Sequence, residues 1–135
     1  MTLTLPATGR APGLARQATR DALLSWQLAH LEETALLLVS ELVTNVVRHA
    51  CSRALAMALR LEPEGASLLI EVHDSDPHEP RPRMPGGPGG LGGPGESGFG
   101  FVLIEALAGK WGVRQTATGK AVWVELDARQ PAIHP

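Results

Sequence analysis

The sequence predicts a single α+β domain in which helices cover one face of a mixed, mostly antiparallel sheet, giving a two-layer α/β sandwich. Two observations support this class. The expected elements run in the order strand, helix, helix, two strands, long loop, helix, two strands. Paired strands joined by short turns, set among helices, are typical of α+β folds. The chain has 135 residues, which is enough for one domain with its own core, so we treat 1–135 as a single unit.

The first half of the chain contains the longer elements. Residues 2–5 predict a short strand that ends at Pro6. Apolar residues at helical spacing predict a first helix over about 12–27 and a second over about 31–50. Two strands are then expected at 53–61 and 67–73, joined by a turn at 63–65 that holds proline and glycine. The apolar side of the second helix consists of Ala35, Leu38, Val39, Leu42, Val43, Val46 and Val47.

A glycine- and proline-rich loop separates the two halves. Fifteen of the 26 glycines and prolines fall between Pro77 and Gly100. This composition excludes a regular helix or a central strand, and long loops in compact domains are usually functional or disordered. After the loop we expect a helix over 99–108 and strands over 111–115 and 121–126, with a turn containing Gly119 between the strands.

Composition excludes several function classes. The net charge is −2 and the basic residues are scattered, which argues against direct nucleic-acid binding. Cys51 is the only cysteine, so no internal disulfide framework is expected and a reducing compartment is favoured. No apolar run reaches membrane-spanning length and no signal peptide is evident. We therefore expect a cytoplasmic protein that does not enter a membrane.

Polar residues of the second helix gather on one half of its surface. Glu41 and Asn45 are neighbours one turn apart, and Arg48 continues the same stripe. A carboxylate, an amide and a guanidinium in one line suit a metal-bound phosphate ligand, because Mg²⁺ takes oxygen donors and keeps phosphates in its shell. A solvated outer helix face is the alternative interpretation of the same pattern.

Two further features flank the loop. Asp74 stands where an apolar strand gives way to irregular chain, a common place for a ligand contact, although Asp, Ser and Pro here also favour a plain turn. Gly98 and Gly100 precede an apolar helix, where backbone amides can approach an anion. Ordinary capping at the end of a loop is the alternative for these glycines.

The order and wording of these motifs resemble the histidine-kinase-like ATPases, the GHKL or Bergerat fold. The run from Glu41 to Ala50, E-L-V-T-N-V-V-R-H-A, resembles the N-box of that family. Asp74 matches the aspartate of the first glycine box, and residues 98–101 resemble the second, with about 77–97 between them as the ATP lid. The closing G-K-A-V-W-V-E-L strand is similar to the bacterial anti-sigma-factor serine kinases, particularly the short single-domain regulators of actinobacteria.

The resemblance implies a role for each matched residue. Asn45 is expected to coordinate the Mg²⁺ that bridges the ATP phosphates, with Glu41 as the general base and Arg48 near the phosphates. Asp74 is expected to accept a hydrogen bond from the adenine amino group. Gly98 and Gly100 are expected to let the lid wrap the phosphates.

The implied reaction moves the γ-phosphoryl group of ATP to a Ser or Thr of a partner. The implied partners are a sigma factor and an anti-anti-sigma protein of the STAS type, and relatives in this family often form homodimers. The chain departs from the family where Asp76 replaces a glycine, and before Gly98 the lid has only Arg81 and Arg83 as basic residues. A non-catalytic ATP-binding or partner-sequestering module is therefore the alternative function.

Overall fold

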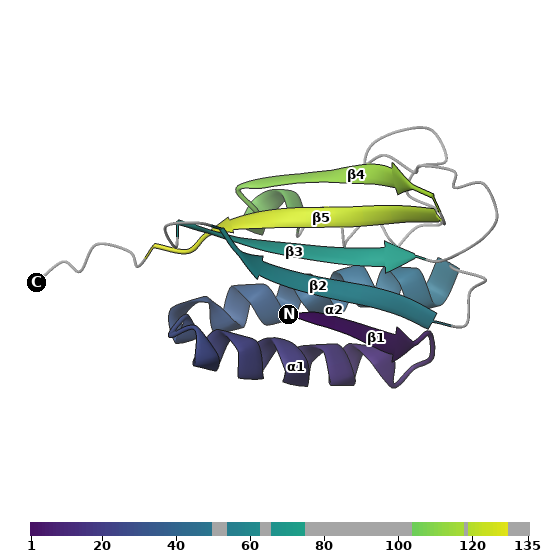
Figure 1. The fold of residues 1–135 in the computed structure, drawn as a ribbon, viewed down its shortest axis with the longest axis horizontal. Coiled ribbons are helices and arrows are strands. Elements are labelled where there is room, and N and C mark those ends of the chain that lie inside the picture. Colours follow the sequence, from purple (N-terminus) through teal and green to yellow (C-terminus); the bar gives the residue numbers. More distant parts are fainter. Residues whose placement is uncertain (50–53, 63–65, 75–103, 118, 130–135) are drawn as a thin grey trace, which may run out of the picture.

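The computed structural model describes residues 1–49, 54–62, 66–74, 104–117 and 119–129 (Figure 1). Within these ranges, the helices and strands follow one another along the chain in the expected order. The elements are β1 (Thr2–Pro6), α1 (Ala11–Ser25), the 3₁₀ helix η1 (Ala29–Leu31), α2 (Glu32–His49), β2 (Ala54–Leu61), β3 (Ser67–Asp74), β4 (Lys110–Thr116) and β5 (Gly119–Asp127).

The five strands form one sheet in the order β1-β2-β3-β5-β4. Every pairing among the described strands is antiparallel, which agrees with the predicted α+β class and its mostly antiparallel sheet. The hairpin partners β2–β3 and β4–β5 lie side by side because their connections are short. The second hairpin is inserted with β5 next to β3, which leaves β4 at the edge.

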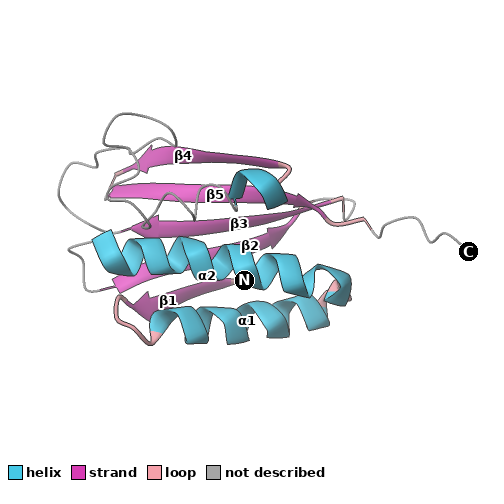
Figure 2. Cartoon of the chain, turned by 180° about the vertical axis from the view of Figure 1, so that it is seen from behind, coloured by secondary structure: helices cyan, strands magenta, loops and turns pink. Residues whose placement is uncertain are grey.

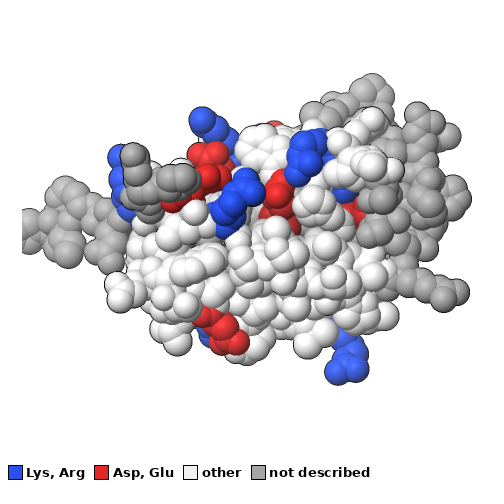
Figure 3. Space-filling view, in the orientation of Figure 1, with Lys and Arg blue, Asp and Glu red and all other residues white. Residues whose placement is uncertain are grey.

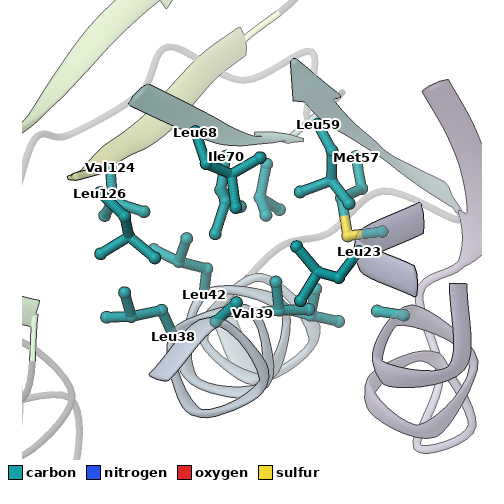
Figure 4. Packing of buried hydrophobic residues seen from close by; sticks show 14 of the residues in the cluster. Leu23, Leu38, Val39, Leu42, Met57, Leu59, Leu68, Ile70, Val124 and Leu126 are labelled. Carbon is teal, nitrogen blue, oxygen red and sulfur yellow. The ribbon is translucent and has the colours of Figure 1, made fainter. Parts of the chain in front are cut away.

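Helices α1 and α2 lie on the same face of the sheet (Figure 2), which confirms the predicted two-layer arrangement. Strand residues alternate between this face and the open one, as the burial pattern of β3 shows. Leucine, isoleucine and valine side chains of α2 and of the central strands meet between the layers (Figure 4). Those labelled there from α2, β3 and β5 are Leu38, Val39, Leu42, Leu68, Ile70, Val124 and Leu126.

The packing of α2 follows its apolar periodicity. Six of the seven residues predicted for its apolar side are buried, and Val47 is partly buried against them. The polar residues therefore occupy the opposite side and the flanks of the helix. This rotation fixes which side chains α2 offers to a ligand.

Helix α1 ends at Ser25, two residues earlier than predicted. Gln27 adopts φ 59°, in the left-handed region that favours glycine. The Leu28 amide donates to the Leu23 carbonyl at 2.7 Å and the Gln27 amide donates to the Leu24 carbonyl at 3.2 Å. These two bonds are a Schellman motif, closed by the buried side chains of Leu23 and Leu28. The helix thus stops without the glycine that usually marks such an end.

Other predicted boundaries differ from the observed ones by one or two residues, and the long loop lies outside the described residues. Pro6 belongs to β1 as its last residue, which an edge strand tolerates. Gly119 is the first residue of β5 and not part of the turn. Of the helix predicted over 99–108, residues 104–107 are described and are helical. The predicted lid at 77–97 and its glycines Gly98 and Gly100 lie outside the described residues. No helix within the described ranges is long and apolar enough to cross a membrane.

Candidate active site

The polar stripe of α2 is partly shielded. Glu41 and Asn45 are partly buried, whereas Arg48, one turn further on, is exposed. Ser40, beside them, accepts a hydrogen bond of 3.2 Å from Arg16 of α1, which ties the two helices together. By contrast, Leu37 on the outward side of α2 is 43% exposed. The stripe around Glu41 and Asn45 is therefore more enclosed than the outward surface of the same helix.

The functional groups of this stripe are available to a ligand. Within the described part of the chain, the side chains of Glu41, Asn45 and Arg48 make no hydrogen bond and no ion pair. Polar groups held in a partly buried position without a protein partner rely on water or on a ligand for their hydrogen bonds. The set comprises a carboxylate, an amide oxygen and a guanidinium. These donors fit Mg²⁺ and phosphate oxygens, which prefer oxygen ligands and cationic donors respectively.

Asp74 is the most enclosed carboxylate of the described chain, with 7% of its surface exposed. It is the last residue of β3 and shares the helix-covered face of the sheet with Val72. Its neighbour on β2 is Leu55, which is fully buried. Asp74 belongs to a strand, and the residues that would complete a turn after it lie outside the described part of the chain. A nearly buried carboxylate at the end of a strand is a candidate for ligand recognition.

The fold brings the helix stripe and Asp74 to the same end of the molecule. The C-terminal end of α2 and the C-terminal end of β3 both lie at the right of Figure 1, and α2 packs on β3. Asn45 and Arg48 belong to the last turns of α2. Asn45 and Arg48 of α2 and Asp74 of β3 therefore belong to element ends that lie at the same end of the molecule, and Glu41 lies one turn before Asn45. The other two predicted site residues, Gly98 and Gly100, lie outside the described residues.

Two residues that the sequence did not single out join this end of the sheet. Lys120 of β5 lies directly across from Asp74, and Gln115 of β4 lies directly across from Lys120. Directly paired residues in antiparallel strands project to the same face. The three side chains therefore form a polar row on the helix-covered face. In the sequence, only the alternation along β5 could have indicated this position of Lys120. Lys120 occupies the same alternating positions as the apolar residues Val122 and Val124, which places it on their face of the strand.

The open face of the sheet has a different character. Its charged side chains gather over β3, β4 and β5, whereas β1 and β2 present mostly uncharged residues (Figure 3). Glu71 accepts from Arg114 at 2.5 Å, and His73 lies 3.7 Å from the same carboxylate. These charges pair with one another on the surface. The unpaired functional groups of α2 point to the helix side as the site.

No three metal-binding side chains of the described residues cluster closely enough to form a cage for an ion. A cation here would consequently depend on phosphate oxygens for part of its shell, which is how Mg²⁺ usually binds with nucleotides.

Comparison with known proteins identifies a family for the chain. The family model described as Histidine kinase-like ATPase domain matches residues 5–126, which include α2, β3 and all of β5 except Asp127. Comparison with the curated proteins found no match. The five-stranded sheet with helices on one face is consistent with the fold of that family. The chain belongs to the histidine kinase-like ATPase domain family.

Proposed function

We propose that this protein is an ATP-binding regulator with serine/threonine protein kinase activity, of the anti-sigma-factor type. The family implies ATP binding, usually with Mg²⁺. The observation that carries the proposal is that the C-terminal end of α2, which holds Asn45 and Arg48, and the C-terminal end of β3, which holds Asp74, lie at the same end of the molecule (Figure 1). Helix α2 supplies side chains for the phosphates and the metal ion, and β3 supplies the Asp74 carboxylate for the adenine ring.

In the proposed complex, Asp74 accepts a hydrogen bond from the adenine amino group. The Asn45 amide oxygen holds Mg²⁺ together with the ATP phosphate oxygens, and Arg48 lies near the phosphates. A Mg²⁺ ion bound there would neutralise part of the phosphate charge. Gly98 and Gly100, carried over from the resemblance, complete the phosphate loop. Such an arrangement works mainly by positioning and charge neutralisation.

Glu41 is the proposed general base for phosphoryl transfer. The hydroxyl oxygen of a partner Ser or Thr bonds to the γ-phosphorus, the bond from that phosphorus to the β–γ bridging oxygen breaks, and ADP leaves. The hydroxyl proton passes to the Glu41 carboxylate. Within the described chain this carboxylate has no hydrogen bond or ion pair, so no protein donor competes for it.

The proposed partners follow from the resemblance. The acceptor is an anti-anti-sigma protein of the STAS type, and the sequestered protein is a sigma factor. A second copy of the chain is the third proposed partner.

A second function is favoured by one feature of the sequence. Asp76 stands where the family has a glycine, which places a side chain and a negative charge near the nucleotide. The lid also offers few basic residues to phosphates. A non-catalytic module that binds ATP weakly, or only sequesters a partner, is the alternative proposal.

Isothermal titration with Mg²⁺-ATP, against Mg²⁺-GTP, tests the nucleotide site. We expect adenine-selective, magnesium-dependent binding that Asn45→Ala abolishes while circular dichroism stays unchanged. Asp74→Asn is expected to weaken ATP binding. Glu33→Ala is the matched control because Glu33 is exposed in the first turn of α2, remote from the site. Unchanged ATP binding by both site variants would contradict the site.

Transfer is tested separately with radiolabelled ATP and a STAS-domain acceptor. Glu41→Ala is expected to keep ATP affinity and to lose phosphoryl transfer, whereas Glu33→Ala keeps both. Equal transfer rates in Glu41→Ala and the parent would remove Glu41 as the base. ATP binding without any transfer by the parent protein would favour the non-catalytic alternative.

A further inference from the structure

The helix-covered face of the sheet changes character at one row. Moving along β3, the residues on this face are Leu68, Ile70 and Val72, and all three are fully buried or nearly so. Their direct neighbours on β2 and β5 are also apolar. The next row holds Asp74 and, directly across from it, Lys120. On β3 and β5 the apolar core therefore ends at this row, whereas Leu55 of β2 in the same row is still buried.

Lys120 of β5 stands at this boundary. It is partly buried, and within the described part of the chain its ammonium makes no hydrogen bond and no ion pair. Gln115, on its other side, belongs to the edge strand β4 and is exposed. A lysine at a partly buried position normally finds an acceptor or extends its head to water. Lys120 is therefore a cationic donor available to a ligand that enters this row.

We infer that Lys120 is a specificity-determining residue that donates a hydrogen bond to ring nitrogen N1 of adenine. The inference rests on the proposed function, in which Asp74 accepts from the adenine amino group. Side chains directly across an antiparallel pair have Cβ atoms about 5 Å apart, so the two can reach one edge of the same base. N1 is an acceptor and lies next to the amino group on that edge.

The pair matches adenine by its hydrogen-bonding sense. Adenine presents a donor at its amino group and an acceptor at N1, which face the carboxylate and the ammonium respectively. Guanine in the same position presents its O6 acceptor to the carboxylate and an N1–H donor to the ammonium. Both contacts would then be repulsive, and unsatisfied polar groups in an enclosed site discriminate strongly.

The test removes either the hydrogen-bond donor, which is the Lys120 ammonium, or the acceptor, which is N1 of adenine. The nucleotides are ATP, 1-deaza-ATP, in which N1 is replaced by C–H, and 7-deaza-ATP as the matched analogue altered elsewhere on the ring. The variant is Lys120→Met, which keeps the apolar stem. Lys110→Met is its control because Lys110 is exposed and starts the same hairpin at the opposite end of β4. Binding is measured by titration with Mg²⁺ present.

We expect the parent protein and Lys110→Met to bind 1-deaza-ATP about tenfold or more weakly than ATP, because a hydrogen bond to a charged group is lost. They should bind 7-deaza-ATP like ATP. Lys120→Met should bind ATP and 1-deaza-ATP equally, both at the weakened level.

Other outcomes overturn the inference in distinguishable ways. If Lys120→Met still discriminates against 1-deaza-ATP, Lys120 does not contact N1, and the nucleotide site stands. In another outcome, Lys120→Met weakens the binding of ATP, 1-deaza-ATP and 7-deaza-ATP by the same factor and still binds 1-deaza-ATP more weakly than ATP. That result would show that Lys120 contacts the phosphates and not N1. No ATP binding by the parent protein would refute the proposed function and this inference together.

Discussion

Replacing Gly112 with alanine tests the tight contact between β4 and β5. Gly112 lies directly across from Trp123 on the open face of the sheet. A Cβ added there would lie 2.7 Å from Cζ2 of Trp123 and 2.9 Å from both its Cε2 and Nε1. Real Cβ atoms do not approach ring atoms so closely, so the indole or the strand must move. The backbone at Gly112 is not in the left-handed region, so this clash is the only native-state penalty.

The expected cost follows from two opposing effects. Overpacking typically destabilises by about 1–3 kcal/mol. Glycine-to-alanine replacement recovers about 0.4–1 kcal/mol by restricting the unfolded chain. We expect Gly112→Ala to lower the free energy of unfolding by about 1–2 kcal/mol. For a domain of this size that corresponds to a fall in Tm of roughly 4–8 °C.

Urea unfolding followed by far-ultraviolet circular dichroism measures this change, because tryptophan fluorescence would itself respond to Trp123. In a Trp123→Val background the ring is absent, so Gly112→Ala should no longer destabilise and should raise the free energy of unfolding by about 0.4–1 kcal/mol. Gly13→Ala is the matched control, since its added Cβ meets only Nη2 of Arg16, at 3.9 Å, and α1 should gain about 0.5–1 kcal/mol. An equal loss from Gly112→Ala with and without the indole would refute the steric reasoning.

Two further predictions concern the core and the surface. Leu42 of α2 faces the sheet and is 2% exposed, so Leu42→Ala should lower the free energy of unfolding by about 2–5 kcal/mol. Leu24 is 70% exposed, so Leu24→Ala should change that free energy by under about 0.5 kcal/mol. Urea unfolding of the two variants measures both changes. Hydrogen bonds from the side chain and backbone of Arg129 lower the pKa of Asp127 to about 2. Any stability from this contact is therefore present above the ordinary aspartate pKa near 4 and is lost as pH falls through about 2. Arg129→Ala should return the Asp127 pKa, followed by NMR titration, toward its ordinary value; an unchanged pKa would contradict the contact.

Local periodicity was sufficient to predict α2 and its orientation. Its apolar residues recur at helical spacing from Ala35 to Val47, about three and a half turns, and this spacing depends only on residues within the same helix. The stripe of Glu41, Asn45 and Arg48 follows from the same spacing. The strands were placed to within one or two residues for a similar reason, because alternation and turn residues are local signals.

The end of α1 was missed because its signal is tertiary. Gln27 takes a left-handed conformation without being glycine, and the cost is offset where Leu23 and Leu28 bury their side chains in the core. A pattern of residue types does not reveal that burial. The placement of β5 between β3 and β4 was missed likewise, since antiparallel hairpins can join a sheet by either strand.

The sequence by itself determined the fold class, the apolar and polar sides of α2, and the residues that resemble an ATP-binding motif. Tertiary structure alone decided the burial of Asp74 and the position of Lys120 beside it. The physical reason is register. Helical spacing relates residues a few positions apart, whereas a cross-strand pair relates residues distant in the chain through backbone hydrogen bonds and core packing.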